Sequence, residues 1–257
     1  MSENTEPEIT DPAARLISLL SRALPVEPGQ HYLTLWQRVF ELPTADVIEI
    51  HHGLDLLRDL IDELERGIMQ ISDIKHAVFL KPLPALRALI SQVNLQANWG
   101  GSKPSLEMAL SELNFCSERL QARNPETKIE PDALDEIRAE VNDLINKLKS
   151  SDSVPRSLRF VLFDLLNSVR RSIDEYAFHG TRGLRKKLFA IVAELQERSV
   201  ELEQNKDKDE VKGFFGLLQK IDQVTATAMK VKELGSAISP YVPLLMQAID
   251  RVVTGAV

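Results

Sequence analysis

The sequence predicts an all-α fold, an antiparallel multi-helix bundle that is either undivided or made of two abutting sub-bundles. Composition is the first observation behind this prediction. Of the 257 residues, 44% are hydrophobic, 27% are charged and only 5% are aromatic, which favours helix formers over strand formers. The second observation is that apolar residues recur at steps of three and four along most of the chain, with no alternating strand pattern of useful length.

Residues 10–126 are predicted to form an acidic helical sub-bundle, preceded by a disordered segment at 1–9. Asp11 followed by Pro12 is typical of a helix start. The carboxylate of an N-cap residue accepts hydrogen bonds from free N–H groups of the first turn, and a proline there has no N–H to satisfy. A second, short helix is expected around residues 33–40.

The firmest periodic pattern begins after Thr44. Eight apolar residues alternate steps of three and four over four heptads: Val47, Ile50, Leu54, Leu57, Ile61, Leu64, Ile68 and Ile71. We interpret this heptad seam as one face of a long core helix. A coiled-coil pairing surface is the alternative, because it has the same spacing.

Further helices are expected at about 73–81 and 84–97, and another from Pro104. The stretch ARNPETKIEPD at 122–132 is the predicted linker, because its two prolines interrupt any continuous helix. Residues 127–257 are therefore predicted to form a C-terminal helical sub-bundle. Its helices are expected to start near Pro131, Pro155, Thr181, residue 209 and Ser239 or Pro240, and the second of them to end around Gly180.

Charge is distributed unevenly along the chain. The net charge is −7, yet residues 156–187 hold 8 Lys and Arg against 3 Asp and Glu, whereas residues 1–155 hold 15 against 25. The segment 156–187 is therefore a basic island in an acidic chain. A broad nucleic-acid-binding face is disfavoured, because the remainder of such a protein repels the polymer.

The helix predicted after Thr181 has an inverted charge order. Its basic residues come first and its glutamates last, although the helix dipole favours the opposite order, so a partner must compensate. One hypothesis is an anion- or partner-binding site around residues 170–187, with free backbone N–H groups near Gly180. The alternative is that the basic island packs against the acidic first half of the chain. The candidate binding residues are Arg170, Arg171, His179, Thr181, Arg182, Arg185 and Lys186.

Residues 211–253 support an alternative function, peripheral membrane contact. The helix from residue 209 has an apolar face flanked by lysines, as in helices that lie on anionic membranes. The uncharged run Leu234–Ile249 follows it, but this run is too short and too rich in proline to span a bilayer. The candidate face for a membrane or a partner consists of Phe214, Phe215, Leu218 and Ile221.

A second alternative is a metal-dependent enzyme that uses His51 and His52 with nearby acidic residues. The sequence contains no second half of a metal-binding motif, and we predict neither a metal nor another cofactor. The single cysteine, Cys116, leaves no intramolecular disulfide.

These patterns together predict a non-enzymatic, cytoplasmic helical interaction or regulatory protein. The acidic and polar start of the chain is unlike a signal peptide, which favours the cytoplasm. The expected partner is another protein. A phosphate-containing or acidic ligand at residues 170–187 and self-association are further expectations.

Overall fold

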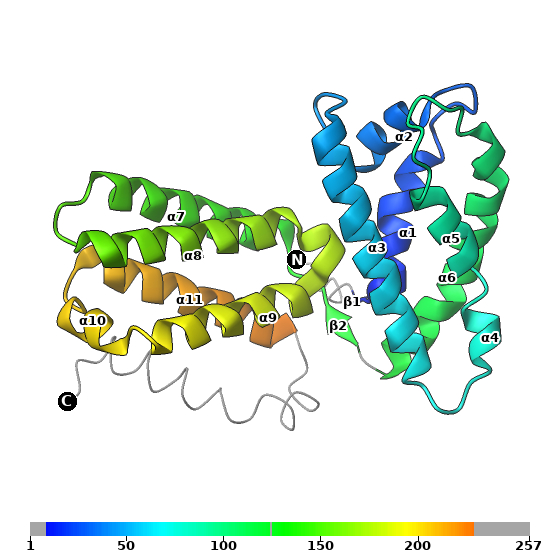
Figure 1. Cartoon of the computed structure of the whole chain (residues 1–257). Coiled ribbons are helices and arrows are strands. Elements are labelled where there is room, and N and C mark those ends of the chain that lie inside the picture. Colours follow the sequence, from blue (N-terminus) through cyan, green and yellow to red (C-terminus); the bar gives the residue numbers. More distant parts are fainter. Residues whose placement is uncertain (1–8, 124, 229–257) are drawn as a thin grey trace, which may run out of the picture. The chain divides into compact units, whose positions relative to one another are not determined.

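The computed structural model describes residues 9–123 and 125–228 (Figure 1). Apart from two strands of two residues each, the regular elements in this part of the chain are helices, which confirms the predicted all-α helical bundle. They form two compact units, Ile9–Pro125 and the part from Glu126 on. Residues 1–8 of the segment predicted to be disordered and the helix expected from residue 239 lie outside the described residues. The arrangement as two abutting sub-bundles stays a prediction.

The unit Ile9–Pro125 is organised around the long helices α3 and α6. Its elements are β1 (Ile9–Thr10), α1 (Pro12–Leu20), the short 3-10 helix η1 (Ser21–Ala23), α2 (Tyr32–Val39), α3 (Val47–Met69), α4 (His76–Phe79), α5 (Leu83–Ile90), η2 (Gly100–Ser102) and α6 (Lys103–Arg123). Helices α1 and α5 each pack against both α3 and α6. Trp36 and Trp99, the two tryptophans of the chain, are fully buried in this unit.

The predicted start of α1 is confirmed. Asp11 Oδ1 accepts hydrogen bonds from the backbone N–H groups of Ala13 (2.8 Å) and Ala14 (3.1 Å). The second oxygen, Oδ2, accepts from Ser117 Oγ (2.5 Å) and Gln121 Nε2 (3.0 Å) on α6. One carboxylate therefore caps α1 and also fastens it to α6.

The heptad seam forms the core stripe of α3, and its last residue, Ile71, follows just after the end of the helix. Seven of its eight residues are buried, and only Val47, at the first turn, is exposed, at 48%. This confirms the interpretation of the segment as a core helix. The seam is occupied within the unit rather than open to another chain.

Helix α5 is shorter than expected, because it ends at Ile90 whereas the sequence predicts a helix over 84–97. The Gln92 side chain accepts a hydrogen bond from the backbone N–H of Asn94 (3.3 Å), and the Asn94 side chain accepts one from that of Gln96 (3.0 Å). Such local bonds compete with helical ones and explain the early end.

Cys116 on α6 is expected to be unreactive in the folded protein. Burial, together with the nearby carboxylates of Asp11 and Glu112, raises the pKa of the thiol from 9.0 to about 11. The thiolate fraction near neutral pH is then about 100-fold lower than for an ordinary thiol. We expect slow reaction with dithiobisnitrobenzoate in buffer and complete reaction in concentrated guanidinium chloride. Rapid labelling of the native protein would contradict this environment.

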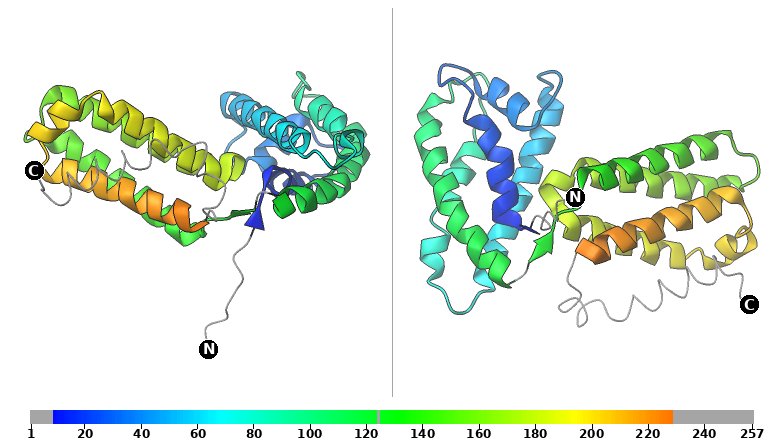
Figure 2. Two further views of the ribbon diagram at one scale, coloured as in Figure 1. Left: turned by 90° about the horizontal axis from the view of Figure 1, so that it is seen from below. Right: turned by 180° about the vertical axis from the view of Figure 1, so that it is seen from behind.

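Up to residue 228, the unit from Glu126 on is built from four long helices and one short one. Its elements are β2 (Glu126–Thr127), α7 (Pro131–Ser150), α8 (Arg156–Asp174), α9 (Tyr176–Gln196), α10 (Ser199–Gln204) and α11 (Asp209–Ala228). Helix α7 packs against α8 and α11, and α9 packs against the same two helices. The four long helices thus surround one core, as the views in Figure 2 show.

Helix α9 is broken at Gly180, whose φ of 64° and ψ of −167° are not helical. Positive φ favours glycine, because a Cβ atom would be strained there. The new helical segment begins at Thr181, as the sequence predicts. The preceding helix, α8, ends earlier than expected, at Asp174 rather than around Gly180, and the residues from Tyr176 already belong to α9.

Candidate anion-binding groove

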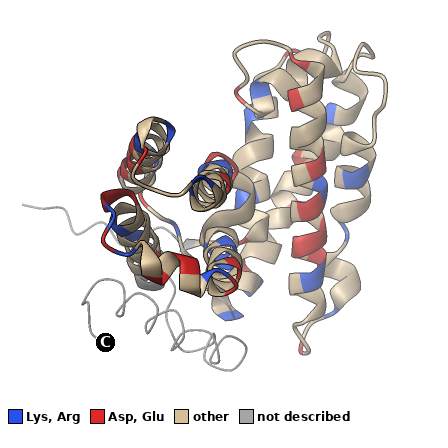
Figure 3. Cartoon of the chain, turned by 60° about the vertical axis from the view of Figure 1, so that its left-hand side comes forward, with Lys and Arg blue, Asp and Glu red and all other residues tan. Residues whose placement is uncertain are grey.

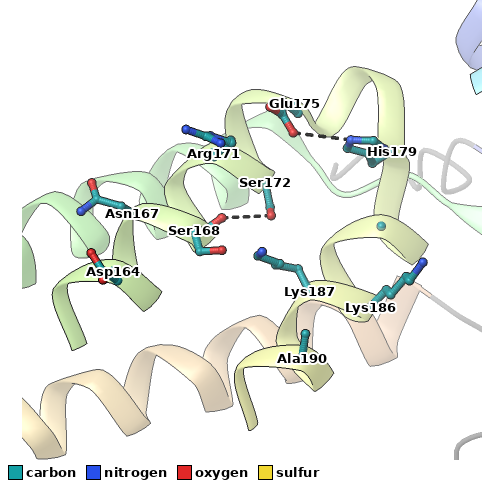
Figure 4. Close-up of a pocket in the computed structure, with 11 residues that line it drawn as sticks. Asp164, Asn167, Ser168, Arg171, Ser172, Glu175, His179, Lys186, Lys187 and Ala190 are labelled. Carbon is teal, nitrogen blue, oxygen red and sulfur yellow. Dashed lines mark hydrogen bonds and ion pairs between the residues drawn. The ribbon is translucent and has the colours of Figure 1, made fainter. Parts of the chain in front are cut away.

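A groove of about 670 Å³ lies between α8 and α9 (Figure 4). Helix α8 contributes Ser168, Arg171 and Ser172 to its lining, and α9 contributes Lys186 and Lys187. The two helices run antiparallel, so the C-terminal half of α8 lies beside the basic start of α9. Packing between the helices therefore gathers these cations around one depression.

Three cations of the groove are not neutralised within the described residues. Arg171, Lys186 and Lys187 form no ion pair there. Lys220 on α11 shows the contrast, since its Nζ lies 2.5 Å from Glu140 Oε1, and hydrogen bonding to this carboxylate raises the pKa of the lysine. The groove cations lack such compensation and are available to a negatively charged group.

Lys187 is the cation best placed for a ligand inside the groove. Figure 4 shows its side chain pointing toward Ser168 and Ser172, whereas Lys186 points away from α8. Ser172 Oγ donates to the backbone carbonyl of Ser168 (3.1 Å), and the Ser168 hydroxyl has no hydrogen-bond partner among the described residues. An ammonium group and a free hydroxyl can therefore donate to the same anion.

Acidic residues limit the charge that the groove can accept. His179 Nε2 lies 3.5 Å from Glu175 Oε2, so a protonated His179 is balanced by its neighbour. Asp164 lines the groove on α8. A ligand with a local negative charge close to Lys187 fits this arrangement better than a densely charged polyanion.

The guanidinium groups of Arg182 and Arg185 are held by carboxylates of the same unit. Arg182 Nε lies 3.4 Å from Glu126 Oε2, and the buried Glu126 also accepts the backbone N–H of Arg182 (3.0 Å). Arg185 Nη2 lies 3.4 Å from Asp222 Oδ1 on α11, and its guanidinium stacks on Phe189. Part of the inverted charge order is thus compensated internally, by Glu126, one of the acidic residues of segment 1–155, and by Asp222 on α11.

Thr181 and Arg170 lie away from the groove. Thr181 is buried, and its hydroxyl donates to the carbonyl of Thr127 (2.8 Å) while it bonds to Tyr176 Oη (2.8 Å). Tyr176 Oη in turn accepts the backbone N–H of Ile129 (2.8 Å). Arg170 is exposed on another side of α8. Both residues are absent from the groove lining.

Of the seven candidate residues, the structure brings together Arg171, His179 and Lys186. Sequence reasoning did not select Lys187, which the structure places in the groove lining. Lys187 comes four residues after Gly183, so the two share one face of the helix, and both line the groove. This spacing was the signal available in the sequence. Charge counting alone does not separate free from paired cations, since basic and acidic residues lie near one another along the helices of both units (Figure 3).

Comparison of the chain with protein-family models, curated proteins and solved structures finds no match. The candidate site therefore depends on its own geometry.

The apolar face of α11 is buried within its unit. Phe214, Phe215, Leu218 and Ile221 all belong to the core formed with α7, α8 and α9. Membrane contact through this face would require α11 to leave the bundle. None of the helices within residues 9–123 and 125–228 is long and apolar enough to cross a bilayer. The rest of the candidate segment, from residue 229, lies outside the described residues.

His51 and His52 are exposed on α3. Asp55, one turn away, forms an ion pair with Arg58. Within the described residues, no group of three or more histidine, cysteine, aspartate or glutamate side chains is arranged to hold a metal ion. The structure thus offers no geometry for a metal centre around these histidines.

Proposed function

We propose that this is a non-enzymatic helical interaction protein whose α8/α9 groove receives an acidic group of a partner protein. The unneutralised cations Arg171, Lys186 and Lys187 around one depression carry the proposal. A cytoplasmic location is part of it, because the one cysteine is a buried free thiol.

Carboxylates are the groups that this groove fits best. Lys187 and the Ser168 hydroxyl supply donors at the centre, and Arg171 supplies a planar donor set at the rim. Glu175 and Asp164 disfavour a ligand that carries dense negative charge over the whole groove. An acidic side chain presented by a protein surface meets both conditions.

The test is binding of a fluorescently labelled peptide that carries two adjacent glutamates among neutral residues, followed by fluorescence polarisation at low salt. Arg171→Glu and Lys187→Glu are each expected to weaken binding about tenfold, because each change replaces an attraction with a repulsion. Added salt is expected to weaken binding of the unaltered protein, since the groove is open to solvent.

Arg170→Glu is the matched control, because it makes the same change one residue away but outside the groove. Lys212→Glu, at an exposed position on α11, is a second control. Both variants should bind like the unaltered protein. Equal weakening by Arg170→Glu and Arg171→Glu would show that only overall charge matters, and absence of saturable binding would refute the site.

A further inference from the structure

The outward face of α9 carries charges of opposite sign in its two halves. Lys186 and Lys187 lie in the first half, and Glu194 and Glu197 lie about two to three turns further on. These four residues share the side of the helix that faces away from the core, at helical spacing. None of them forms an ion pair within the described residues.

This charge order does not stabilise α9 itself. Positive side chains near a helix start and negative ones near its end both oppose the helix dipole. Arg182 and Arg185 are compensated inside the unit, but Lys186, Lys187, Glu194 and Glu197 are not. A partner that presents the opposite signs in the reverse order would be complementary to this face.

An antiparallel copy of the same helix supplies both signs. A two-fold axis across the middle of α9, near Ala190, would set the lysines of one copy opposite the glutamates of the other, and the reverse. A two-fold interface is self-complementary, since each contact occurs twice. A parallel arrangement would place like charges together and is disfavoured.

Apolar surface lies beside the acidic half of this face. Phe160 on α8 is 59% exposed, with the Arg156 guanidinium 5.7 Å from its ring centre. Along the helix pair, Asp164 on α8 is level with Ala190 on α9, because both line the groove, and Ser157 is level with Glu201, to which it bonds. Phe160 comes between Ser157 and Asp164 on α8, so it lies beside Glu194 and Glu197. Val200, 71% exposed, follows the end of α9. Covering the Phe160 ring at an interface adds favourable burial of apolar surface to the charge pairing.

We infer that the outward face of α8 and α9 binds the same face of a second copy of this chain, in an antiparallel two-fold dimer. Glu194 and Glu197 of each copy then provide the acidic groups that Arg171, Lys186 and Lys187 of the other receive. The inference depends on the proposed function, because it names the partner of the groove. Its contacts are few and largely charged, so the expected dissociation constant is on the order of 10 μM at low salt.

Charge reversal tests the pairing directly, with mass measured by sedimentation equilibrium over a range of concentrations. The double variants Lys186→Glu/Lys187→Glu and Glu194→Lys/Glu197→Lys are each expected to raise the dimer dissociation constant about 100-fold. Mixed in equal amounts, they should form a heterodimer. The quadruple variant that exchanges all four charges should dimerise like the unaltered protein, and Lys212→Glu should change nothing.

These variants are expected to fold, because each reversal brings the charge into agreement with the helix dipole. Far-UV circular dichroism checks this. A dimer that survives both double variants would overturn the inference, as would failure of the mixture and of the quadruple variant to associate.

The outcomes for the two proposals are separable. A monomer that still binds the two-glutamate peptide through Arg171 and Lys187 would overturn the dimer but leave the groove as a site for another acidic protein. A monomer that does not bind this peptide would overturn both.

Discussion

Replacement of Phe214 by alanine is expected to lower the free energy of unfolding of the unit from Glu126 on by about 3–5 kcal/mol. Phe214 is fully buried, and its ring meets that of Phe215 edge-to-face at 6.0 Å between centroids. The neighbouring Gly213 lies so close to α7 that a Cβ atom there would be 2.7 Å from Leu144 Cδ2. With the helices this close, little room remains for them to relax into the space left by the ring.

Two probes can show which unit loses stability. Both tryptophans lie in the unit Ile9–Pro125, so tryptophan fluorescence reports on that unit, while far-UV circular dichroism reports on helices of both. Phe214→Ala should move the dichroism transition to lower urea concentration and leave the fluorescence transition in place. Such a result would also support the predicted linker at residues 122–132.

Phe160→Ala is the matched control, because Phe160 lies on the same unit but is largely exposed. Its cost is expected to stay below about 1 kcal/mol. Equal shifts of dichroism and fluorescence for Phe214→Ala would show that the two units unfold together. No shift in either would contradict the core position of Phe214.

Local chemistry explains which parts of the fold could be predicted. The start of α1 follows from the N-cap position of Asp11 and the proline after it, and the burial of α3 follows from a seam whose spacing matches one helix face. The early end of α5 could not be read in the same way. Its cause is a pair of amide side chains that bond to nearby backbone, in a segment whose apolar spacing still permits a helix.

The basic island was visible in the sequence, but its division into paired and unpaired cations was not. Arg182 is held by Glu126 and Arg185 by Asp222, partners 56 and 37 residues away along the chain. Only the packing of α9 against its neighbours determines these distances. The inverted charge order correctly indicated compensation, whereas the position of the free cations beside α8 required the structure.

Replacement of Asp11 by alanine is expected to destabilise the other unit, Ile9–Pro125, by about 2–4 kcal/mol. The change removes the cap of α1 and leaves the buried Ser117 hydroxyl without its acceptor, while the Gln121 amide keeps only its hydrogen bond to Ser117 Oγ (2.9 Å). Asp11→Asn should cost less, because an amide oxygen can still cap the helix and Gln121 can turn its own oxygen toward the new N–H group.

The signature of Asp11→Ala in the two-probe experiment is the reverse of that for Phe214→Ala. The tryptophan transition should move to lower urea concentration, because Trp36 and Trp99 lie in the unit that Asp11 stabilises. The part of the dichroism transition that reports on α7–α11 should keep its midpoint urea concentration. If Asp11→Ala leaves the fluorescence transition unchanged, the contact between α1 and α6 through this carboxylate contributes little to stability. If it also destabilises α7–α11, the linker does not separate two units that unfold independently.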